Sequence, residues 1–221
     1  MYTTDVLKKR MIDGAYDAEL TRLYPAGTID AQRKRYCRVI GEFEEFYGEG
    51  REAGLFSAPG RTEIGGNHTD HNHGRVLAAS VNLDAIAVAA KSEGTVVNVK
   101  SEGYAMDTVD ISDLKPHEKE FGKSRALVRG VCSEFKRRGY NVGAFDATTA
   151  SDVLSGSGLS SSAAFEVLLG TIVNHLFNDG KVSDVEIAQI AQAAENKFFG
   201  KPCGLLDQMT SSVGSFVEID F

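Results

Sequence analysis

The chain has 221 residues, enough for one large or two small domains, and 42% of them are hydrophobic, which provides ample core. A formal net charge of −7 and the lack of a long basic run argue against nucleic acid or an anionic membrane as the main partner. The sequence contains no apolar run of about 18 residues and no signal-peptide pattern, so a soluble protein that is not secreted is expected. Three widely spaced cysteines, Cys37, Cys132 and Cys203, fit reduced thiols in a cytoplasm better than disulfides or a zinc site.

Residues 1–50 are expected to form a helical extension that is separate in character from the rest of the chain. Thr28 is placed to cap a helix with one apolar face, and Gly48 is placed to end it. The other face of that helix is crowded with charges, Arg35 among them, and a mixed-charge face of this kind is expected to be solvated. We therefore assign this region a structural role, packed on the back of the main domain.

From Ala53 onward the chain changes to short strands, turns and helices. The expected strands, rich in Val, Ile and Ala, cover residues 55–58, 76–81, 85–91, 95–100, 144–153 and 214–221. The expected helices cover residues 123–138 and 163–177, followed by one that begins with a Ser183–Glu186 capping box and ends at 200–202. Residues 92–94 are expected to be a hairpin turn. This order predicts an α+β fold, in which the last strand has no partner in view, and this suggests a truncated sequence.

The stretch 154–164, Leu-Ser-Gly-Ser-Gly-Leu-Ser-Ser-Ser-Ala-Ala, lies between an expected strand and an expected buried helix. Free amide N–H groups and the positive end of the helix dipole favour a phosphate there, and glycine lets the backbone close around it. The three consecutive serine hydroxyls add hydrogen-bond donors or a metal ligand. The stretch is not a Walker P-loop, because no Gly-Lys-Ser/Thr follows the glycines. An ordinary serine-capped helix behind a flexible turn is the structural alternative.

A dense polar cluster fills residues 58–74, Ala-Pro-Gly-Arg-Thr-Glu-Ile-Gly-Gly-Asn-His-Thr-Asp-His-Asn-His-Gly. Such groups are costly to bury without partners, and a polyol such as a sugar supplies those partners, while an arginine stabilises developing phosphoryl charge. Two alternatives stay open: a solvated polar loop, and a zinc site built from His68, His71, His73 and Asp70. On a strand His68 would point to the opposite face from the other two histidines, which disfavours zinc.

Two further carboxylates attract attention. Glu195 lies at the edge of the buried face of an otherwise apolar helix, where it either reaches water or needs a cation such as Mg²⁺ or an arginine. Asp207 follows two leucines in Gly204-Leu205-Leu206-Asp207-Gln208. A partly desolvated aspartate at this position suits a general base acting on a hydroxyl, or else it caps the next element.

Together and in this order, the three clusters resemble the galactokinase branch of the GHMP small-molecule kinases. Residues 58–74 resemble the motif Gly-Arg-Val-Asn-Leu-Ile-Gly-Glu-His-Thr-Asp-Tyr-Asn, residues 158–163 carry the Gly-Leu-Ser-Ser-Ser-Ala core intact, and residues 203–208 resemble Cys-Gly-x-x-Asp-Gln. The resemblance covers roughly residues 55–221. It implies a phosphotransferase that uses ATP and Mg²⁺ to phosphorylate the C1 hydroxyl of galactose.

The same resemblance implies a fold and a division of the chain. The fold would be the N-terminal lobe of a GHMP kinase, which is similar to domain 2 of ribosomal protein S5. Residues 1–50 would form the helical extension, residues 51–205 the N-terminal lobe with the sugar and ATP motifs, and residues 206–221 the start of a truncated C-terminal lobe. The C-terminal glycine-rich motif of the family lies beyond residue 221, so a fragment that is inactive by itself is expected.

The family also implies roles for individual residues. Asp207 would take the proton from the C1 hydroxyl, and Arg61 would stabilise the transferring phosphoryl group. Ser162 and Glu195 would hold Mg²⁺. The ATP phosphates would be wrapped by Gly156, Ser157, Gly158, Leu159, Ser160, Ser161 and Ser162. The sugar would be bound by Asn67, His68, Thr69, Asp70 and Gly204.

Two departures from the family pattern concern the sugar. Asn67 stands where the family usually has a glutamate, and His71 where it has a tyrosine; an amide donates as well as accepts, so we hypothesise altered sugar recognition. A GHMP kinase for another sugar, such as N-acetylgalactosamine, is therefore one alternative function. A non-catalytic galactose and ATP sensor is another, but such sensors lack a Ser-Ala pair of the glycine turn that is complete here. The remote alternative is a zinc hydrolase built on the histidine cluster.

Overall fold

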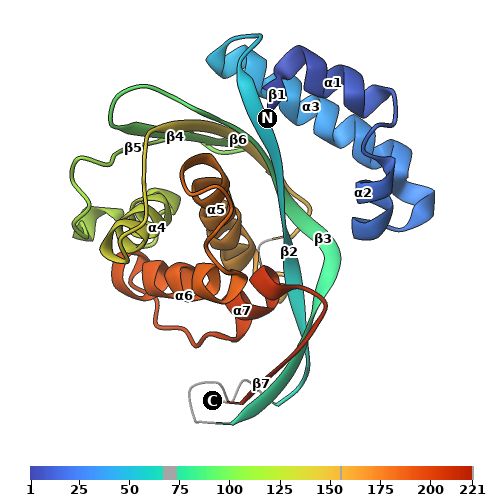
Figure 1. Ribbon diagram of the computed structural model, residues 1–221. Coiled ribbons are helices and arrows are strands. Elements are labelled where there is room, and N and C mark those ends of the chain that lie inside the picture. The colour runs from blue at the N-terminus through green and yellow to red at the C-terminus, as the bar shows by residue number, and fades with distance from the viewer. Residues whose placement is uncertain (67–73, 155, 221) are drawn as a thin grey trace.

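The computed structural model describes residues 1–66, 74–154 and 156–220, and it is built around one curved sheet with helices on both faces (Figure 1). The helices are α1 Thr4–Ile12, α2 Asp17–Leu23, α3 Ile29–Tyr47, α4 Ser124–Arg137, α5 Ser161–Phe177, α6 Asp184–Ala194 and α7 Leu206–Val213. The strands are β1 Tyr2–Thr3, β2 Glu52–Gly65, β3 Arg75–Lys91, β4 Val96–Ser101, β5 Asp107–Asp110, β6 Phe145–Ser151 and β7 Phe216–Asp220. Within the described residues no helix is long and apolar enough to cross a membrane.

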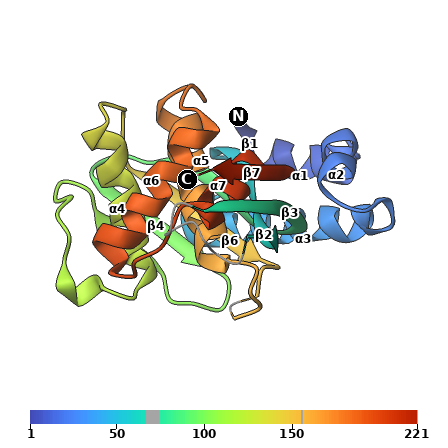
Figure 2. The ribbon, with the colours of Figure 1, turned by 90° about the horizontal axis from the view of Figure 1, so that it is seen from below.

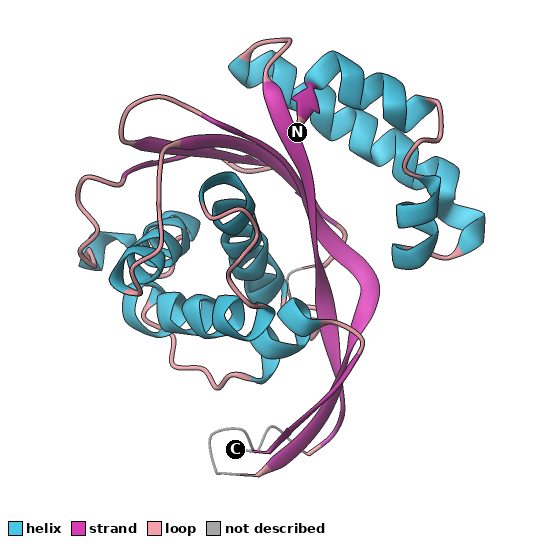
Figure 3. Cartoon of the chain, in the orientation of Figure 1, coloured by secondary structure: helices cyan, strands magenta, loops and turns pink. Residues whose placement is uncertain are grey.

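The sheet has the order β1-β2-β3-β6-β4-β5 across the described part of the chain, with β7 attached to β3. Its pairs are antiparallel except β4 and β6, which run parallel. Strands β2 and β3 form a long ribbon that extends below the helical layer, and β7 joins the lower end of that ribbon (Figures 1 and 3). The predicted α+β composition is confirmed.

Helices α4 to α7 cover one face of the sheet and α1 to α3 cover the other, as Figures 1 and 2 show from two directions. The first layer encloses the larger core, which includes the fully buried side chains of Phe135, Phe145 and Leu168. The second core joins α1–α3 to the back of the sheet through Phe43 and Ile86. Burial of apolar side chains on both faces is what fixes the central strands, since each face excludes water from the sheet.

The structure corrects the expected strands and turn in four respects. The segments 76–81 and 85–91 belong to one strand, β3, and the strand expected at 55–58 extends over 52–65. The last strand does have a partner, because Val76 to Ala79 of β3 pair with β7. The segment 92–94 is not a hairpin turn, since β6 lies between β3 and β4 and pairs with both. Turn residues indicate where the chain reverses, but they do not select which strands pair.

The N-terminal region is helical as expected, yet two of its residues differ from the prediction. Thr28 precedes α3 without capping it, because its hydroxyl donates to the Pro25 carbonyl at 2.7 Å. Arg35 is buried instead of solvated: its Nη1 lies 2.6 Å from Oδ1 of Asp84, and its Nη2 donates to the Asp84 carbonyl at 2.8 Å. A buried arginine needs such partners, and here they come from β3, which lies across the helix–sheet interface.

Candidate active site

The candidate site lies where β2 and α7 meet the glycine-rich turn, residues 156–160, which leads into the N-terminus of α5. Helix α7 packs against α5, α6, β2 and β3, and so brings residues near the end of the described chain against its first long strand. The turn itself contains Gly156 and Gly158 with φ of 78° and 77°, a backbone region that only glycine enters at little cost. This explains why glycines occupy these positions.

Arg61 and Asp207 form a close ion pair at the centre of the site. Nε of Arg61 donates to Oδ1 of Asp207 at 2.7 Å, and Nη2 lies 2.6 Å from the same oxygen. Nη1 donates to the Gly158 carbonyl at 2.8 Å, so one guanidinium joins the aspartate to the glycine turn. The arginine side chain is buried and that of the aspartate is 30% exposed. The carboxylate is therefore fixed in place and still open to a ligand.

Ser160 holds the other oxygen of the same carboxylate. Its hydroxyl donates to Oδ2 of Asp207, and its backbone has φ 56° and ψ 63°, the left-handed region. A side chain in that region costs on the order of 1 kcal/mol relative to glycine, and such residues gather at functional sites. The serine hydroxyl does not cap α5, so the simple serine-capped helix is not what the structure contains.

Ser162 and Glu195 face each other across the first turn of α5. The Ser162 hydroxyl lies 3.4 Å from Oε1 of Glu195, and Nζ of Lys201 lies 3.4 Å from the same oxygen. Glu195 begins a π-helical turn, Glu195–Phe199, and is only 2% exposed, so it does not reach water. Turns of this type are frequent at functional sites. A hydroxyl and a carboxylate oxygen are ligands that suit Mg²⁺.

A third carboxylate, which the sequence motifs did not single out, lies behind this pair. Glu166 is fully buried in α5, and Nε2 of Gln208 donates to its Oε2 at 3.0 Å and to Oε2 of Glu195 at 2.8 Å. Burial and the neighbouring Glu195 carboxylate hold the pKa of Glu166 well above its ordinary value. The feature of the sequence that could have identified Glu166 is its position four residues after Ser162 on an apolar helix, because this spacing puts both side chains on one face.

The remaining atoms of this group also bear on whether a cation fits. Oε1 of Glu166 and Oε1 of Gln208 are buried and have no hydrogen-bond partner among the described residues. Two acidic side chains and the Gln208 amide make the region rich in oxygen acceptors, with Lys201 at its edge. Oxygen-rich surroundings of this kind fit the Mg²⁺ that the family implies.

Other residues of the glycine turn serve the turn itself. The Ser157 hydroxyl donates to the Leu154 carbonyl at 2.7 Å. Leu159 packs its side chain against the main core, while its carbonyl accepts from the backbone N–H of Arg61 at 3.0 Å. Ser161 is the first residue of α5. The turn is thus anchored to β2 through backbone and side chain of a single arginine.

Gly204 lies in a segment that α6 and the π-helical turn hold in place. The carbonyl of Cys203 accepts from Gln192 at 3.3 Å and from Asn196 at 3.2 Å, and its N–H donates to the Asn196 side chain at 2.7 Å. All three cysteines of the chain are free thiols. The other expected sugar ligands, Asn67, His68, Thr69 and Asp70, lie outside the described residues, as do His71 and His73 of the alternative zinc site. Among the described residues, no group of three or more histidine, cysteine, aspartate or glutamate side chains is arranged to hold a metal ion.

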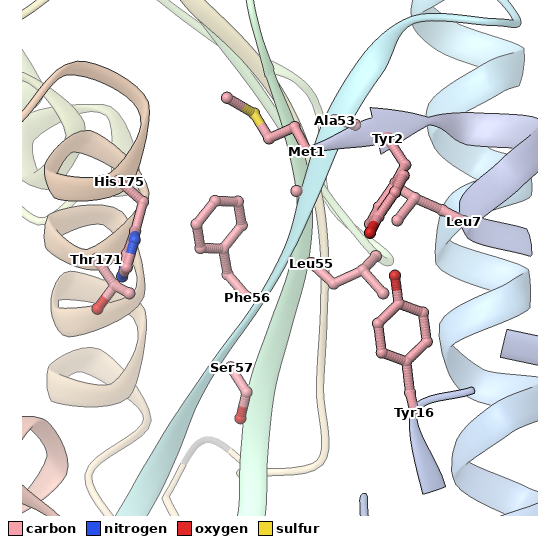
Figure 4. A pocket seen from close by; sticks show the side chains of 11 residues that line it. Met1, Tyr2, Leu7, Tyr16, Ala53, Leu55, Phe56, Ser57, Thr171 and His175 are labelled. Atoms are coloured by element: carbon pink, nitrogen blue, oxygen red, sulfur yellow. The ribbon is translucent and has the colours of Figure 1, made fainter. Parts of the chain in front are cut away.

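A separate pocket of about 380 Å³ opens between the N-terminal segment, the start of β2 and α5 (Figure 4). Tyr2, Tyr16, Phe56 and His175 are among its lining residues. None of the residues that surround Asp207 lines it. The pocket is therefore distinct from the candidate site.

Known proteins resemble this chain in sequence and in fold. The chain matches the galactokinase galactose-binding signature at residues 41–91 and the GHMP kinase N-terminal domain at residues 126–215. It is 37% identical over 174 residues to the galactokinase of Clostridium tetani and 33% identical over 178 residues to that of Bacillus subtilis. These alignments cover 78% and 79% of this chain, but 44% and 45% of the two relatives.

Among solved structures, the chain is similar to the Lactococcus lactis galactokinase complexed with galactose, with a TM-score of 0.75 and 29% identity. That match covers 81% of this chain and 47% of the other. The Methanococcus jannaschii mevalonate kinase shares the fold, with a TM-score of 0.65, 16% identity and coverage of 76% and 54%.

The domain match and the shared fold place the chain in the class of GHMP kinases, with the architecture that the three motifs predicted. Within that class the chain belongs to the galactokinase family, whose galactose-binding signature it carries. It spans about half the length of the galactokinases it matches. The division at residues 50 and 205 stays a prediction.

Proposed function

We propose that this chain forms the N-terminal portion of an ATP- and Mg²⁺-dependent kinase that phosphorylates the C1 hydroxyl of galactose. The observation that carries the proposal is the Asp207 carboxylate, which Arg61 and Ser160 hold beside the glycine-rich turn. A carboxylate fixed next to a phosphate-binding turn is placed to act on a hydroxyl and a phosphoryl group at once. Similarity to galactokinases supports the choice of sugar.

In the proposed reaction the C1 oxygen of the sugar forms a bond to the γ-phosphorus of ATP. The bond from that phosphorus to the bridging oxygen breaks, ADP leaves, and the hydroxyl proton passes to Asp207. Arg61 neutralises charge on the transferring group, and its bond to the Gly158 carbonyl keeps it at the turn. Positioning and neutralisation of charge account for most of the catalysis in such transfers.

Ser162 and Glu195 would hold the Mg²⁺, which supplies charge neutralisation on the phosphates when it is bound. The phosphates themselves would lie over residues 156–162, at the N-terminus of α5. Asn67, His68, Thr69, Asp70 and Gly204 would bind the sugar. The three free cysteines are consistent with a cytoplasmic location.

Two other functions remain to be separated from this one. A GHMP kinase for a different sugar, such as N-acetylgalactosamine, is favoured by Asn67 in place of the usual glutamate. A galactose and ATP sensor is disfavoured by the complete Ser160–Ala163 run and by the Arg61–Asp207 pair. We also propose that the 221-residue chain alone is inactive, since its aligned part covers only 44% and 45% of the two curated relatives.

The test is an assay of ADP release with Mg-ATP and galactose, N-acetylgalactosamine or glucose. It uses both this chain and a polypeptide extended to the length of the relatives. Asp207→Ala is the decisive variant, and Asp179→Ala is its control, because Asp179 is exposed and pairs with Lys181 away from the site. Galactose-dependent release that only Asp207→Ala abolishes supports the proposal. Release with another sugar alone moves the substrate, and binding without release favours the sensor.

A further inference from the structure

Glu166 has no role in the proposed reaction, yet burying its side chain costs the fold free energy. Its carboxylate is fully buried in α5, a helix whose other inward residues are almost all apolar. Burying a carboxylate that lacks a paired cation is among the most expensive arrangements in a protein. A residue of this kind calls for an explanation in terms of what it contacts.

The contact is with Gln208, the residue that follows Asp207. The side chain of Gln208 is fully buried, and its single amide nitrogen donates to Glu166 at 3.0 Å and to Glu195 at 2.8 Å. The same nitrogen lies 3.6 Å from the Cys203 sulfur. Two N–H groups thus join two carboxylates from different elements, α5 and the π-helical turn after α6.

Glu166 determines which end of the Gln208 amide faces Glu195. An amide presents a donor at one end and an acceptor at the other, and its orientation follows from the hydrogen bonds around it. An oxygen of each acidic side chain accepts from the NH₂ group, so together the two side chains turn that group toward themselves. Without Glu166 the amide is free to rotate and to place its oxygen against the Glu195 carboxylate, which would repel it.

We propose that Glu166 is a positioning residue, which acts through Gln208 to hold the Glu195 carboxylate in the orientation that the cation needs. The inference rests on the proposed function for the assignment of Glu195 to Mg²⁺. Residues that orient a metal ligand typically change metal affinity by about 10- to 100-fold when they are altered. The same amide ties Glu195 to α7, the helix that carries Asp207.

The test measures Mn²⁺ affinity in the presence of ADP, by electron paramagnetic resonance on the full chain. Glu166→Leu and Gln208→Leu are each expected to weaken Mn²⁺ binding by about 10- to 100-fold. Glu166→Gln keeps an oxygen that accepts from Gln208, so its affinity is expected to stay within about threefold of the wild type. Because both Leu variants break the same connection, the double variant is expected to be no weaker than Gln208→Leu alone.

Asn174→Leu is the matched control, since Asn174 is a buried polar residue of α5 that bonds to Val182 far from Glu195. Thermal unfolding of every variant separates lost affinity from lost structure. Wild-type affinity in Glu166→Leu and Gln208→Leu would overturn the inference, as would equal loss in the Asn174→Leu control. A Glu166→Gln variant that binds Mn²⁺ as weakly as Gln208→Leu would also overturn it, because Glu166 would then act through its charge. If Glu166→Leu fails to fold, Gln208→Leu and Glu166→Gln still decide.

The readout does not depend on sugar phosphorylation. Weakened Mn²⁺ binding in the two Leu variants, together with no turnover on any sugar by the polypeptide extended to the length of the relatives, would keep the role of Glu166 and reject the kinase proposal. Turnover by the extended polypeptide, together with unchanged Mn²⁺ binding in the two Leu variants, would keep the kinase proposal and reject the role of Glu166. A wild-type chain that binds no Mn²⁺ with ADP would reject both the assignment of Glu195 and the inference.

Discussion

Gly60 lies at the first of two irregular steps in the β2–β3 ladder, directly before Arg61. Its φ is outside the left-handed region, so alanine suits its backbone and any effect of substitution is steric. A Cβ at this position would lie 2.9 Å from the Leu159 carbonyl oxygen and 3.1 Å from a methyl carbon of Val153. Gly60→Ala would therefore push the glycine-rich turn away from β2.

The size of the effect follows from these contacts. The Leu159 carbonyl has to retreat by about 0.5 Å, from 2.9 Å to the 3.4 Å at which ordinary contact begins. This carbonyl accepts from the N–H of Arg61 at 3.0 Å, so the movement strains the bond that anchors the turn. Overpacking of this kind typically lowers the free energy of unfolding by about 1–3 kcal/mol. Nucleotide affinity is expected to fall as well, because the same turn is the proposed phosphate site.

Urea denaturation gives the free energy of unfolding, and calorimetric titration with ATP gives nucleotide affinity. Gly65→Ala is the matched control, because Gly65 lies in the same strand and a Cβ there meets nothing within 4 Å. Its free energy of unfolding is expected to stay within about 0.5 kcal/mol of the wild type. If Gly60→Ala is as stable as this control and binds ATP equally well, the steric argument is wrong.

Three further outcomes are expected. Ser160→Gly and Ser160→Ala both remove the hydroxyl that binds Asp207 and should slow ADP release by the extended polypeptide alike. The glycine variant should be the more stable of the two in thermal unfolding, by about 1 kcal/mol, because only alanine has a side chain in the left-handed region. Gly41→Ala, at a mid-helix position where a Cβ meets one flexible atom at 4.0 Å, should raise the free energy of unfolding by about 0.5–1 kcal/mol; an unchanged or lower value would contradict this. Hydrogen bonds from Arg129 lower the pKa of Glu120, so this pair stabilises the fold above the ordinary carboxyl pKa and stops doing so as the pH falls through the lowered value. Glu120→Gln should therefore cost about 1–3 kcal/mol near pH 7 and progressively less as the pH falls below the ordinary carboxyl pKa, as denaturation over a series of pH values would reveal.

The sequence was most informative where structure depends on near neighbours in the chain. Gly48 ends α3 with φ 92°, and the Ser183 hydroxyl accepts from the N–H of Glu186 at 3.3 Å, as the capping pattern predicted. The glycines of the turn at 154–164 have the positive φ that their positions require. Such features involve only a few consecutive residues, so composition and spacing are enough to predict them.

Residues of the candidate site were predicted as well, but not from their near neighbours in the chain. Arg61, Ser160 and Asp207 were chosen from three separate motifs, and the structure brings them into direct contact. The choice rested on residue type and on family resemblance, while the hydrogen bonds among them were not predicted. In particular, nothing local indicates that the Ser160 hydroxyl binds Asp207, because 47 positions separate the two residues.

By itself, then, the sequence determined the fold class, the family and the residue types of the site. The tertiary structure alone decided that β6 inserts between β3 and β4, that Arg35 is buried on Asp84, and that Glu166 shares an amide with Glu195. Each of these depends on residues distant in the chain. Periodicity reports which face of an element is apolar, but the partner that meets a polar side chain there is chosen only when the layers pack.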